Sequence, residues 1–385
     1  MVHVFGPERE RELLARGFSR RDFFKIASLM GAGVGAAASL PFFGEAALAQ
    51  LSQVGEIPPD AVLINANENP LGPCPEALTA TTSMVKEGGR YHFEMTDQFC
   101  RMLAAQENLP PDHVQAFAGS SPPLAQSVVA FTSPSKSFVT GDPGYEAGER
   151  AAKFIGAKVH RVPLTKSFAH DVKAMATADP NAGLIYICNP NNPTGTLTPD
   201  ADIDWLVDNM PRGAVLLLDE AYVHIAGCRM RSDLVAAGKP VIILRTFSKL
   251  YGMAGLRVGA ALAQPKLLNR LSQYSQGIMP ITGLAAAMAS LQVPELVPTR
   301  RKIIADTRAK VFAFLDRNRF SYTPSVSNHF MLDVKQPGEN IVKAMRPEKI
   351  YIGRVWPSWP TYCRITIGTP EEMDRFQSAF LKVMA

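Results

Sequence analysis

The sequence predicts an α/β protein with a doubly wound, mostly parallel sheet and a smaller C-terminal α+β domain. The chain has 385 residues, of which 46% are hydrophobic, and this supplies core material for one large domain or for two domains. Continuous apolar runs at 183–188, 214–219 and 241–245 are typical of strands buried on both faces of a parallel sheet. Amphipathic stretches alternate with strand-like runs, which favours strand–helix–strand units with right-handed crossovers.

The predicted elements begin after a Pro- and Asn-rich arm at 58–75. Helices are expected at 76–86, 122–131, 145–155 and 200–210. Pro122 suits the start of its helix because a first-turn residue needs no N–H donor. Further strands are expected at 114–117, 137–140 and 158–162, and the C-terminal part adds a helix at 300–318 and strands at 330–334 and 364–367. We therefore divide the chain into a leader at 1–49, an arm at 50–75, a large domain at 76–285 and a small domain at 286–385.

The leader has the layout of an export signal. The charged segment Ser19–Lys25 precedes an uncharged run at 26–44, and Ala47–Ala49 offers a small-residue cleavage site. The run is rich in Gly and Ala, so we expect no stable membrane anchor. Ser-Arg-Arg-x-Phe-Phe-Lys resembles the twin-arginine export signature, which predicts contact with export machinery and a periplasmic location. The alternative is a basic helical arm ahead of a buried Gly/Ala helix.

Charge and cysteine content argue against several kinds of partner and site. The chain has 40 Lys and Arg against 35 Asp and Glu, with no basic stripe, so nucleic acid is not an expected partner. Five cysteines without Cys-x-x-Cys spacing indicate neither a disulfide framework nor a zinc site, and we expect no metal. Gly31–Ala36 fits a dinucleotide-binding pattern, but the residues before it do not form a strand, so we discard that match.

Polar residues gather where three predicted strands end. Asn189–Gly195 follows one strand, Asp219–Tyr222 ends the next, and Thr246–Lys249 follows a third. Ligands of open parallel sheets bind beyond these carboxyl ends. A carboxylate, a lysine, an amide and a tyrosine at one place suggest a cofactor with a ring nitrogen, a phenolic oxygen and an aldehyde. Gly119–Ser121 at a helix start offers a phosphate cradle, and Arg257 offers a positive fork for the same group.

Several of these blocks resemble the signature sequences of fold-type-I pyridoxal-phosphate aminotransferases of class I/II. The matching blocks are Asn-Pro-Asn-Asn-Pro-Thr-Gly at 189–195, Asp-x-Ala-Tyr at 219–222 and Ser-Lys-x-Tyr-Gly-x-Ala-Gly-x-Arg at 248–257. Asn-Glu-Asn-Pro-x-Gly-Pro at 67–73 and Arg-Tyr at 90–91 are similar to the histidinol-phosphate aminotransferase subgroup. The resemblance runs from about Leu63 to the C-terminus. Two features depart from that family: Ser-Ser-Pro follows Gly119 where Gly-x-Asp-Glu is frequent, and the export signal is unusual for cytoplasmic amino-acid synthesis.

The resemblance implies a role for each matching residue. Lys249 would hold pyridoxal 5′-phosphate as an internal aldimine and then shuttle the proton, which makes it the catalytic residue. Asp219 would pair with the pyridinium nitrogen. Asn192 and Tyr222 would hydrogen-bond the phenolic oxygen, and Tyr145 would stack on the ring.

The phosphate and the substrate would be held by further polar residues. The phosphate ligands implied by the resemblance are Ser120, Ser121, Thr246, Ser248, Arg257 and, from the second subunit of a homodimer, Tyr91. Arg364 would receive the substrate carboxylate, because its planar fork fits that group bidentately. Arg354 is a weaker candidate for a second anion contact.

The resemblance implies transfer of an amino group between an amino acid and a 2-oxo acid by a two-step, ping-pong route. A decarboxylase or an oxidase of the same fold is the main alternative, and no residue separates it from a transferase. A protein that binds the cofactor without chemistry is a further alternative, which loss of the lysine would mark, whereas Lys249 is present. The identity of the amino donor is not encoded in any pattern that we identify.

Overall fold

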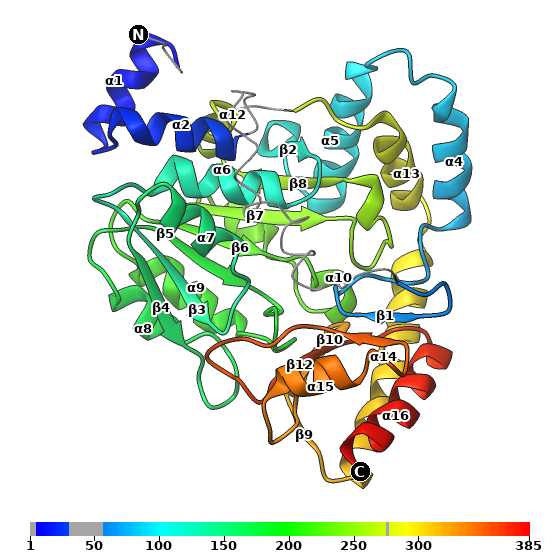
Figure 1. Cartoon of the computed structure of the whole chain (residues 1–385). Helices are drawn as coiled ribbons and strands as arrows, with labels where there is room; N and C mark the ends of the chain where they lie inside the picture. Colours follow the sequence, from blue (N-terminus) through cyan, green and yellow to red (C-terminus); the bar gives the residue numbers. More distant parts are fainter. Residues whose placement is uncertain (1–4, 31–56, 275–276) are drawn as a thin grey trace.

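A seven-stranded sheet forms the centre of the computed structural model, which describes residues 5–30, 57–274 and 277–385 (Figure 1). The strand order is β2-β8-β7-β6-β5-β3-β4. Most neighbours pair in parallel, whereas β8 is antiparallel to both β2 and β7. The strands are β2 (Val114–Phe117), β3 (Ser137–Asp142), β4 (Val159–Pro163), β5 (Ala182–Cys188), β6 (Val215–Asp219), β7 (Val241–Thr246) and β8 (Gly259–Ala263).

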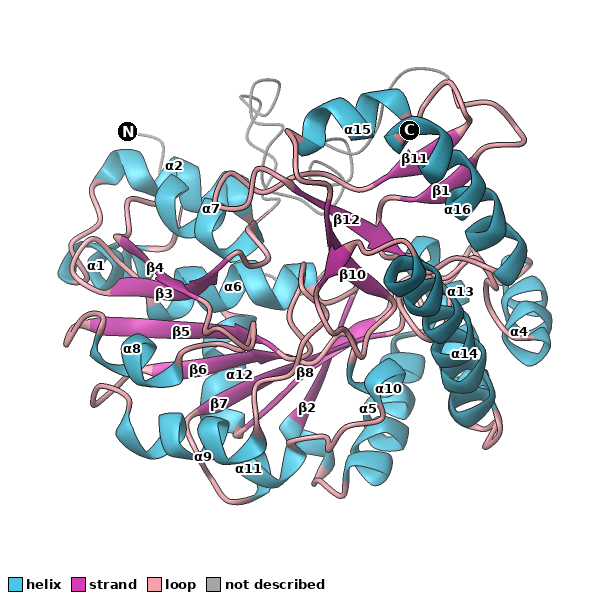
Figure 2. Cartoon of the chain, turned by 90° about the horizontal axis from the view of Figure 1, so that it is seen from below, coloured by secondary structure: helices cyan, strands magenta, loops and turns pink. Residues whose placement is uncertain are grey.

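Helices cover both faces of this sheet, which confirms the predicted doubly wound α/β class. Figure 2 shows α6 (Ser121–Phe131) and α7 (Ala147–Phe154) on one face, and α12 (Pro265–Ser272) packs against α6. On the opposite face lie α8 (Val172–Thr177), α9 (Asp200–Asn209) and α11 (Ser232–Ala236). Strands β5, β6 and β7 are buried along their whole length, as their continuous apolar sequences require.

A second layer of helices flanks the β2 edge of the sheet. Helix α5 (Phe93–Glu107) packs against β2, and α4 (Pro75–Val85) packs against α13 (Ile281–Leu291). Short helical turns connect the larger elements: η2 (Pro111–His113), α10 (Val223–Ala226) and η3 (Ala254–Leu256).

The C-terminal part forms a smaller α+β unit beside the carboxyl ends of the central strands. Its antiparallel sheet has the order β12-β10-β9, and a separate parallel pair joins β1 to β11. Strand β1 belongs to the predicted arm, so the arm is anchored on this unit. The strands are β1 (Val62–Ile64), β9 (Ser321–Tyr322), β10 (His329–Asp333), β11 (Ile350–Ile352) and β12 (Tyr362–Thr366), and the helices are α14 (Leu296–Arg317), α15 (Gly338–Ala344) and α16 (Pro370–Met384).

The described part of the predicted leader forms two helices that pack on the large domain. Helices α1 (Pro7–Ala15) and α2 (Arg20–Leu29) lie near α6 and α12. The Arg16 guanidinium donates to the carbonyls of Ala130 (3.1 Å) and Thr132 (2.9 Å) at the end of α6, and to the Tyr274 hydroxyl (2.8 Å). The buried apolar side chains of this segment include Leu13, Phe18, Phe23 and Ile26.

The rest of the predicted apolar run, from residue 31, and the predicted cleavage site at 47–49 lie outside the described residues. Within the described ranges, no helix combines the length and the apolar character that a membrane crossing requires.

Candidate active site

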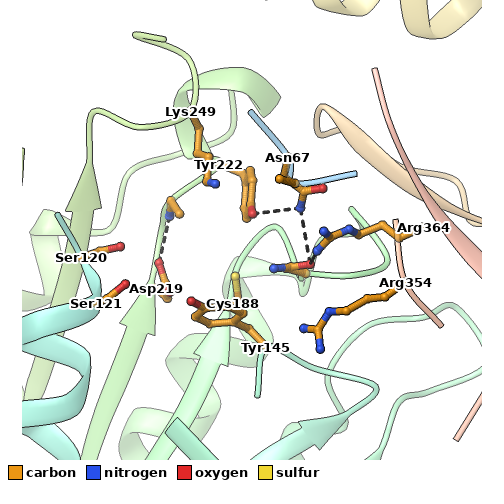
Figure 3. Close-up of a pocket in the computed structure, with 13 residues that line it drawn as sticks. Asn67, Ser120, Ser121, Tyr145, Cys188, Asp219, Tyr222, Lys249, Arg354 and Arg364 are labelled. Carbon is orange, nitrogen blue, oxygen red and sulfur yellow. Dashed lines mark hydrogen bonds between the residues drawn. The ribbon is translucent and has the colours of Figure 1, made fainter. Parts of the chain in front are cut away.

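A pocket opens at the carboxyl ends of β5, β6 and β7, facing the C-terminal unit (Figure 3). It contains about 640 Å³ of empty space, part of which is open solvent. Nine residues singled out in the sequence line it together: Ser120, Ser121, Tyr145, Asn192, Asp219, Tyr222, Lys249, Arg354 and Arg364. Four more lining residues, to which the sequence analysis gave no role, are Ala66, Asn67, Cys188 and Ala221.

Lys249 and Asp219 reach this pocket from neighbouring strands. Asp219 is the last residue of β6, and Lys249 follows the end of β7, which pairs with β6. The Lys249 Nζ atom lies 5.9 Å from the centre of the Tyr222 ring. The Asp219 carboxylate is fixed by two donors, because the Tyr186 hydroxyl donates to Oδ2 (3.0 Å) and the Ala221 amide donates to Oδ1 (3.1 Å). A buried, oriented carboxylate can keep a cationic ring nitrogen in place.

A hydrogen-bonded chain links the arm to the middle of the pocket. Asn67 Nδ2 donates to the Tyr222 hydroxyl (3.1 Å) and to Asn192 Oδ1 (3.4 Å). The Thr366 hydroxyl donates to Asn67 Oδ1 (3.1 Å), so the Asn67 amide is held by the C-terminal unit. Burial raises the pKa of Tyr222 well above its ordinary value, so its phenol is neutral and can donate to a ligand oxygen. Asn67 is the first residue of the Asn-Glu-Asn-Pro-x-Gly-Pro block at 67–73, and this position is the sequence feature that could have indicated it as a pocket residue.

The candidate phosphate end lies at the start of α6. The Thr246 hydroxyl donates to the Ser248 hydroxyl (3.0 Å), and Arg257 Nη1 lies 3.5 Å from the Ser248 oxygen. Ser248 thus contacts both Thr246 and Arg257, and none of the three lines the pocket described above. Gly119 has a φ of +91°, and a Cβ atom there would lie 2.2 Å from Arg257 Nη2. The positive φ favours glycine at this position, where the chain passes close to the guanidinium before α6. The first turn of α6 contains Pro122 and Pro123, which have no N–H, so an anion here would depend mainly on the Arg257 charge, on hydroxyl groups and on the helix dipole.

Two arginines form the opposite wall of the pocket. Arg364 is 5% exposed, and it donates to Asn192 Oδ1 (2.9 Å) and to the Asn65 carbonyl (2.6 Å). Its buried Nε has no hydrogen-bond partner within the described part of the chain, so this N–H can donate to a ligand in the pocket. Burial and the neighbouring Arg354 lower the pKa of Arg364 to about 10, which leaves it positively charged at neutral pH. Arg354 forms an ion pair with Glu146.

Tyr91 lies apart from the other candidate residues. Its side chain is 63% exposed and stacks on Phe93, with ring centres 5.4 Å apart, outside the pocket. Within the described ranges, no group of three or more His, Cys, Asp or Glu side chains could hold a metal ion.

Comparison with known proteins identifies the family. Residues 59–380 match the family model for aminotransferase class I and II. The chain is 30% identical over 338 residues to histidinol-phosphate aminotransferase from Moorella thermoacetica, covering 85% of this chain and 86% of that protein. It is 33% identical over 330 residues to an aromatic amino acid aminotransferase from Mycobacterium tuberculosis, covering 84% and 92%. Histidinol-phosphate aminotransferase from Sinorhizobium meliloti, solved in complex with pyridoxal-5′-phosphate, superposes with a TM-score of 0.79 at 26% identity, covering 91% and 97%. The chain therefore belongs to the class I and II aminotransferase family.

Proposed function

We propose that this chain is a pyridoxal-phosphate-dependent aminotransferase that moves an amino group between an amino acid and a 2-oxo acid. The observation that carries this function is the placement of Lys249 and Asp219 at the ends of two paired strands, facing one pocket. Membership of the aminotransferase family supports the same reaction. The lysine also argues against a protein that only binds the cofactor.

The residues present fit each chemical group of pyridoxal phosphate. The Arg257 guanidinium beside Gly119, together with the positive end of the α6 dipole, suits the phosphate dianion. Asp219 suits a protonated ring nitrogen, and the Tyr222 phenol suits the phenolic oxygen. Lys249 supplies the amine that an aldehyde requires. The proposed cofactor ligands are Ser120, Ser121, Tyr145, Asn192, Asp219, Tyr222, Thr246, Ser248, Lys249 and Arg257.

Three residues of the chain have distinct roles in the proposed reaction. When bound, pyridoxal phosphate supplies a conjugated ring that accepts the electron pair released at the substrate carbon. Asp219 holds the proton on the ring nitrogen, which keeps that ring electron-poor. Lys249 Nζ would take the proton from the substrate carbon as a general base and would then return it as a general acid. Arg364 binds the substrate carboxylate and orients the carbon toward Lys249.

A half-reaction measured with single amino acids tests this function. The cofactor-loaded enzyme is mixed with one amino acid at a time, and the absorbance of the aldehyde and amine forms of the cofactor is recorded. We expect conversion to the amine form without carbon dioxide release or dioxygen uptake, followed by reversal with a 2-oxo acid. Carbon dioxide release would indicate a decarboxylase, dioxygen uptake an oxidase, and no change with any donor a binding protein. Histidinol phosphate and aromatic amino acids are the first donors to test, because relatives carry those names.

We propose in addition that the enzyme is a homodimer. Large apolar side chains are exposed on α4 and at the start of α5, where Leu78 is 51%, Val85 65%, Tyr91 63% and Phe93 63% exposed. Exposed apolar side chains of this size are typical of a surface that a partner covers. Tyr91 would then complete the phosphate site of the other subunit. Light scattering should give about twice the mass of one chain, and a fully active monomer would contradict this assembly.

We also propose that the N-terminal segment directs export to the periplasm. The residues Arg20 and Arg21 are exposed at the start of α2, whereas Phe23 of the same motif is buried. The arginine pair is therefore accessible to a receptor while α1 and α2 are packed on the enzyme. Replacing both residues, as Arg20→Lys with Arg21→Lys, should leave the protein in the cytoplasmic fraction because the receptor reads this pair. Cell fractionation measures the distribution, and Arg11→Lys, an exposed basic residue outside the pair, serves as the control. Equal periplasmic amounts of all forms would contradict the proposed signal.

A further inference from the structure

Trp356 connects the C-terminal unit, through a hydrogen bond, to the turn that contains Tyr145. It lies in the connection between β11 and β12 and is 2% exposed. Its indole Nε1 donates to the Gly144 carbonyl (2.9 Å), next to Tyr145. In the same connection, the Ser358 hydroxyl donates to Asp142 Oδ1 (2.9 Å) at the end of β3. The indole is therefore held in one orientation by a buried hydrogen bond, and it does not itself line the active-site pocket.

Both pocket arginines lie against this one indole. The guanidinium carbon of Arg354 is 4.4 Å from the ring centre of Trp356, and that of Arg364 is 5.4 Å from it. Both distances fall within the range of a cation–π interaction, which strengthens when the cation is removed from water. Figure 3 shows the two arginine side chains entering the pocket from the same side. The two like charges repel each other. The Glu146 carboxylate, which pairs with Arg354, offsets part of that repulsion, and the shared aromatic ring adds a further favourable contact for both cations.

We propose that Trp356 is a positioning residue that holds the guanidinium groups of Arg354 and Arg364 for the anionic group of the substrate. This inference rests on the proposed aminotransferase function, whose substrates carry a carboxylate. The other tryptophan of the connection serves a different purpose, because Trp359 packs against Phe168 (5.6 Å between ring centres) and Tyr362 (4.9 Å). Trp356 thus acts through the arginines and contributes to substrate affinity.

The expected effects on KM and kcat depend on the stage of the reaction at which the arginines contact the substrate anion. The carboxylate contacts its arginine both before and during proton transfer, so a weaker contact affects both states alike. Loss of such uniform binding raises KM and leaves kcat nearly unchanged. A residue that supported only the fold would instead lower the amount of active enzyme or its kcat.

Three variants test the proposal: Trp356→Leu, Trp356→Phe and, as a matched control in the same connection, Trp359→Leu. For Trp356→Leu we expect KM for an amino acid to rise about 10- to 30-fold, the factor that loss of buried cation–π contacts implies, with kcat within about threefold of wild type. Trp356→Phe keeps an aromatic face and should recover part of the affinity. Trp359→Leu should stay close to wild type. The dissociation constant of 3-phenylpropanoate, a carboxylate without an amino group, should follow the same order in calorimetric titrations of the cofactor-loaded protein.

Several outcomes would overturn the proposal. One is an unchanged KM and an unchanged 3-phenylpropanoate affinity in Trp356→Leu. Another is equal impairment of Trp356→Leu, Trp356→Phe and Trp359→Leu, which would mean that the connection matters only for packing. A loss of kcat at constant KM would also contradict it. If the wild type turned over no amino acid, the proposed function would fail, while the 3-phenylpropanoate titrations would still decide the role of Trp356.

Discussion

Replacing Lys249 by alanine is expected to lower turnover by about 10⁴-fold or more, because one side chain both attaches the cofactor and moves the proton. No other lysine lines the pocket in the described part of the chain, so no neighbouring amine can replace it. The cofactor should still bind through the other proposed ligands. Turnover with the best amino donor measures the effect. Borohydride treatment followed by denaturation should leave cofactor attached to wild-type protein and none attached to the variant.

Two further variants make the Lys249 result specific. Lys249→Arg keeps a positive charge but cannot attach an aldehyde or transfer a proton at neutral pH, so it should be as inactive as the alanine variant. Lys239→Ala removes a lysine whose Nζ pairs with Asp208 (2.7 Å) near the surface, and it should retain full activity. Turnover by Lys249→Ala within tenfold of wild type would contradict the assigned mechanism.

The buried centre of the sheet could be predicted from the sequence because its strands are apolar on both faces. The predicted runs at 183–188, 214–219 and 241–245 lie within one residue of β5, β6 and β7 at each end. Polar residues directly after such runs must lie at one edge of a parallel sheet. For this reason the sequence could also place Asp219 and Lys249 near each other.

Other parts of the fold depend on contacts that no local pattern encodes. Strand β8 consists of Gly, Ala and Leu, which have weak strand propensity, and pairing with β2 and β7 sets its antiparallel direction. Asn67 enters the pocket only because β1 of the arm pairs with β11 near the C-terminus. Helix α7 begins at Ala147 and not at Tyr145. The turn before it is held by a distant residue, because the Gly144 carbonyl accepts a hydrogen bond from the Trp356 indole.

A buried group of three charged side chains behind the active site joins residues that are far apart in the sequence. Arg245 Nε and Nη2 donate to the two carboxylate oxygens of Glu107 (2.7 and 3.1 Å), and Arg245 Nη1 pairs with Glu220. All three side chains are buried. Burial raises the pKa of Glu220, and the Arg245 charge offsets this only in part. Glu220 follows Asp219 directly, and Arg245 precedes Thr246, so the triad connects helix α5 to both strand ends that carry the site.

Replacing Arg245 by methionine is expected to lower the free energy of unfolding by about 3–5 kcal/mol, because two carboxyl groups would remain buried without their cation. Denaturation by urea measures this change. Arg229→Met removes an exposed ion pair with Asp233 and should cost at most about 1 kcal/mol. Removing all three charges at once, as Glu107→Gln, Arg245→Met and Glu220→Gln, should recover much of the loss, because no uncompensated charge is then buried.

The pH dependence of Arg245→Met separates a charge effect from a packing effect. In the intact protein the pKa of Glu107 is lowered, because Arg245 outweighs the effect of burial, whereas the pKa of Glu220 is already raised. Without the guanidinium, the pKa of Glu107 in the folded protein should rise above that in the unfolded chain, and the pKa of Glu220 should rise further. A carboxyl group of this kind binds a proton more readily in the folded protein than in the unfolded chain. Its contribution to the free energy of unfolding is therefore favourable at low pH and is lost as the pH rises through its folded-state pKa. The loss in unfolding free energy should therefore be smaller at about pH 5 than at about pH 8. A loss that is equal at both pH values would mean that Arg245 contributes through volume alone, and that the two carboxyl groups do not depend on its charge.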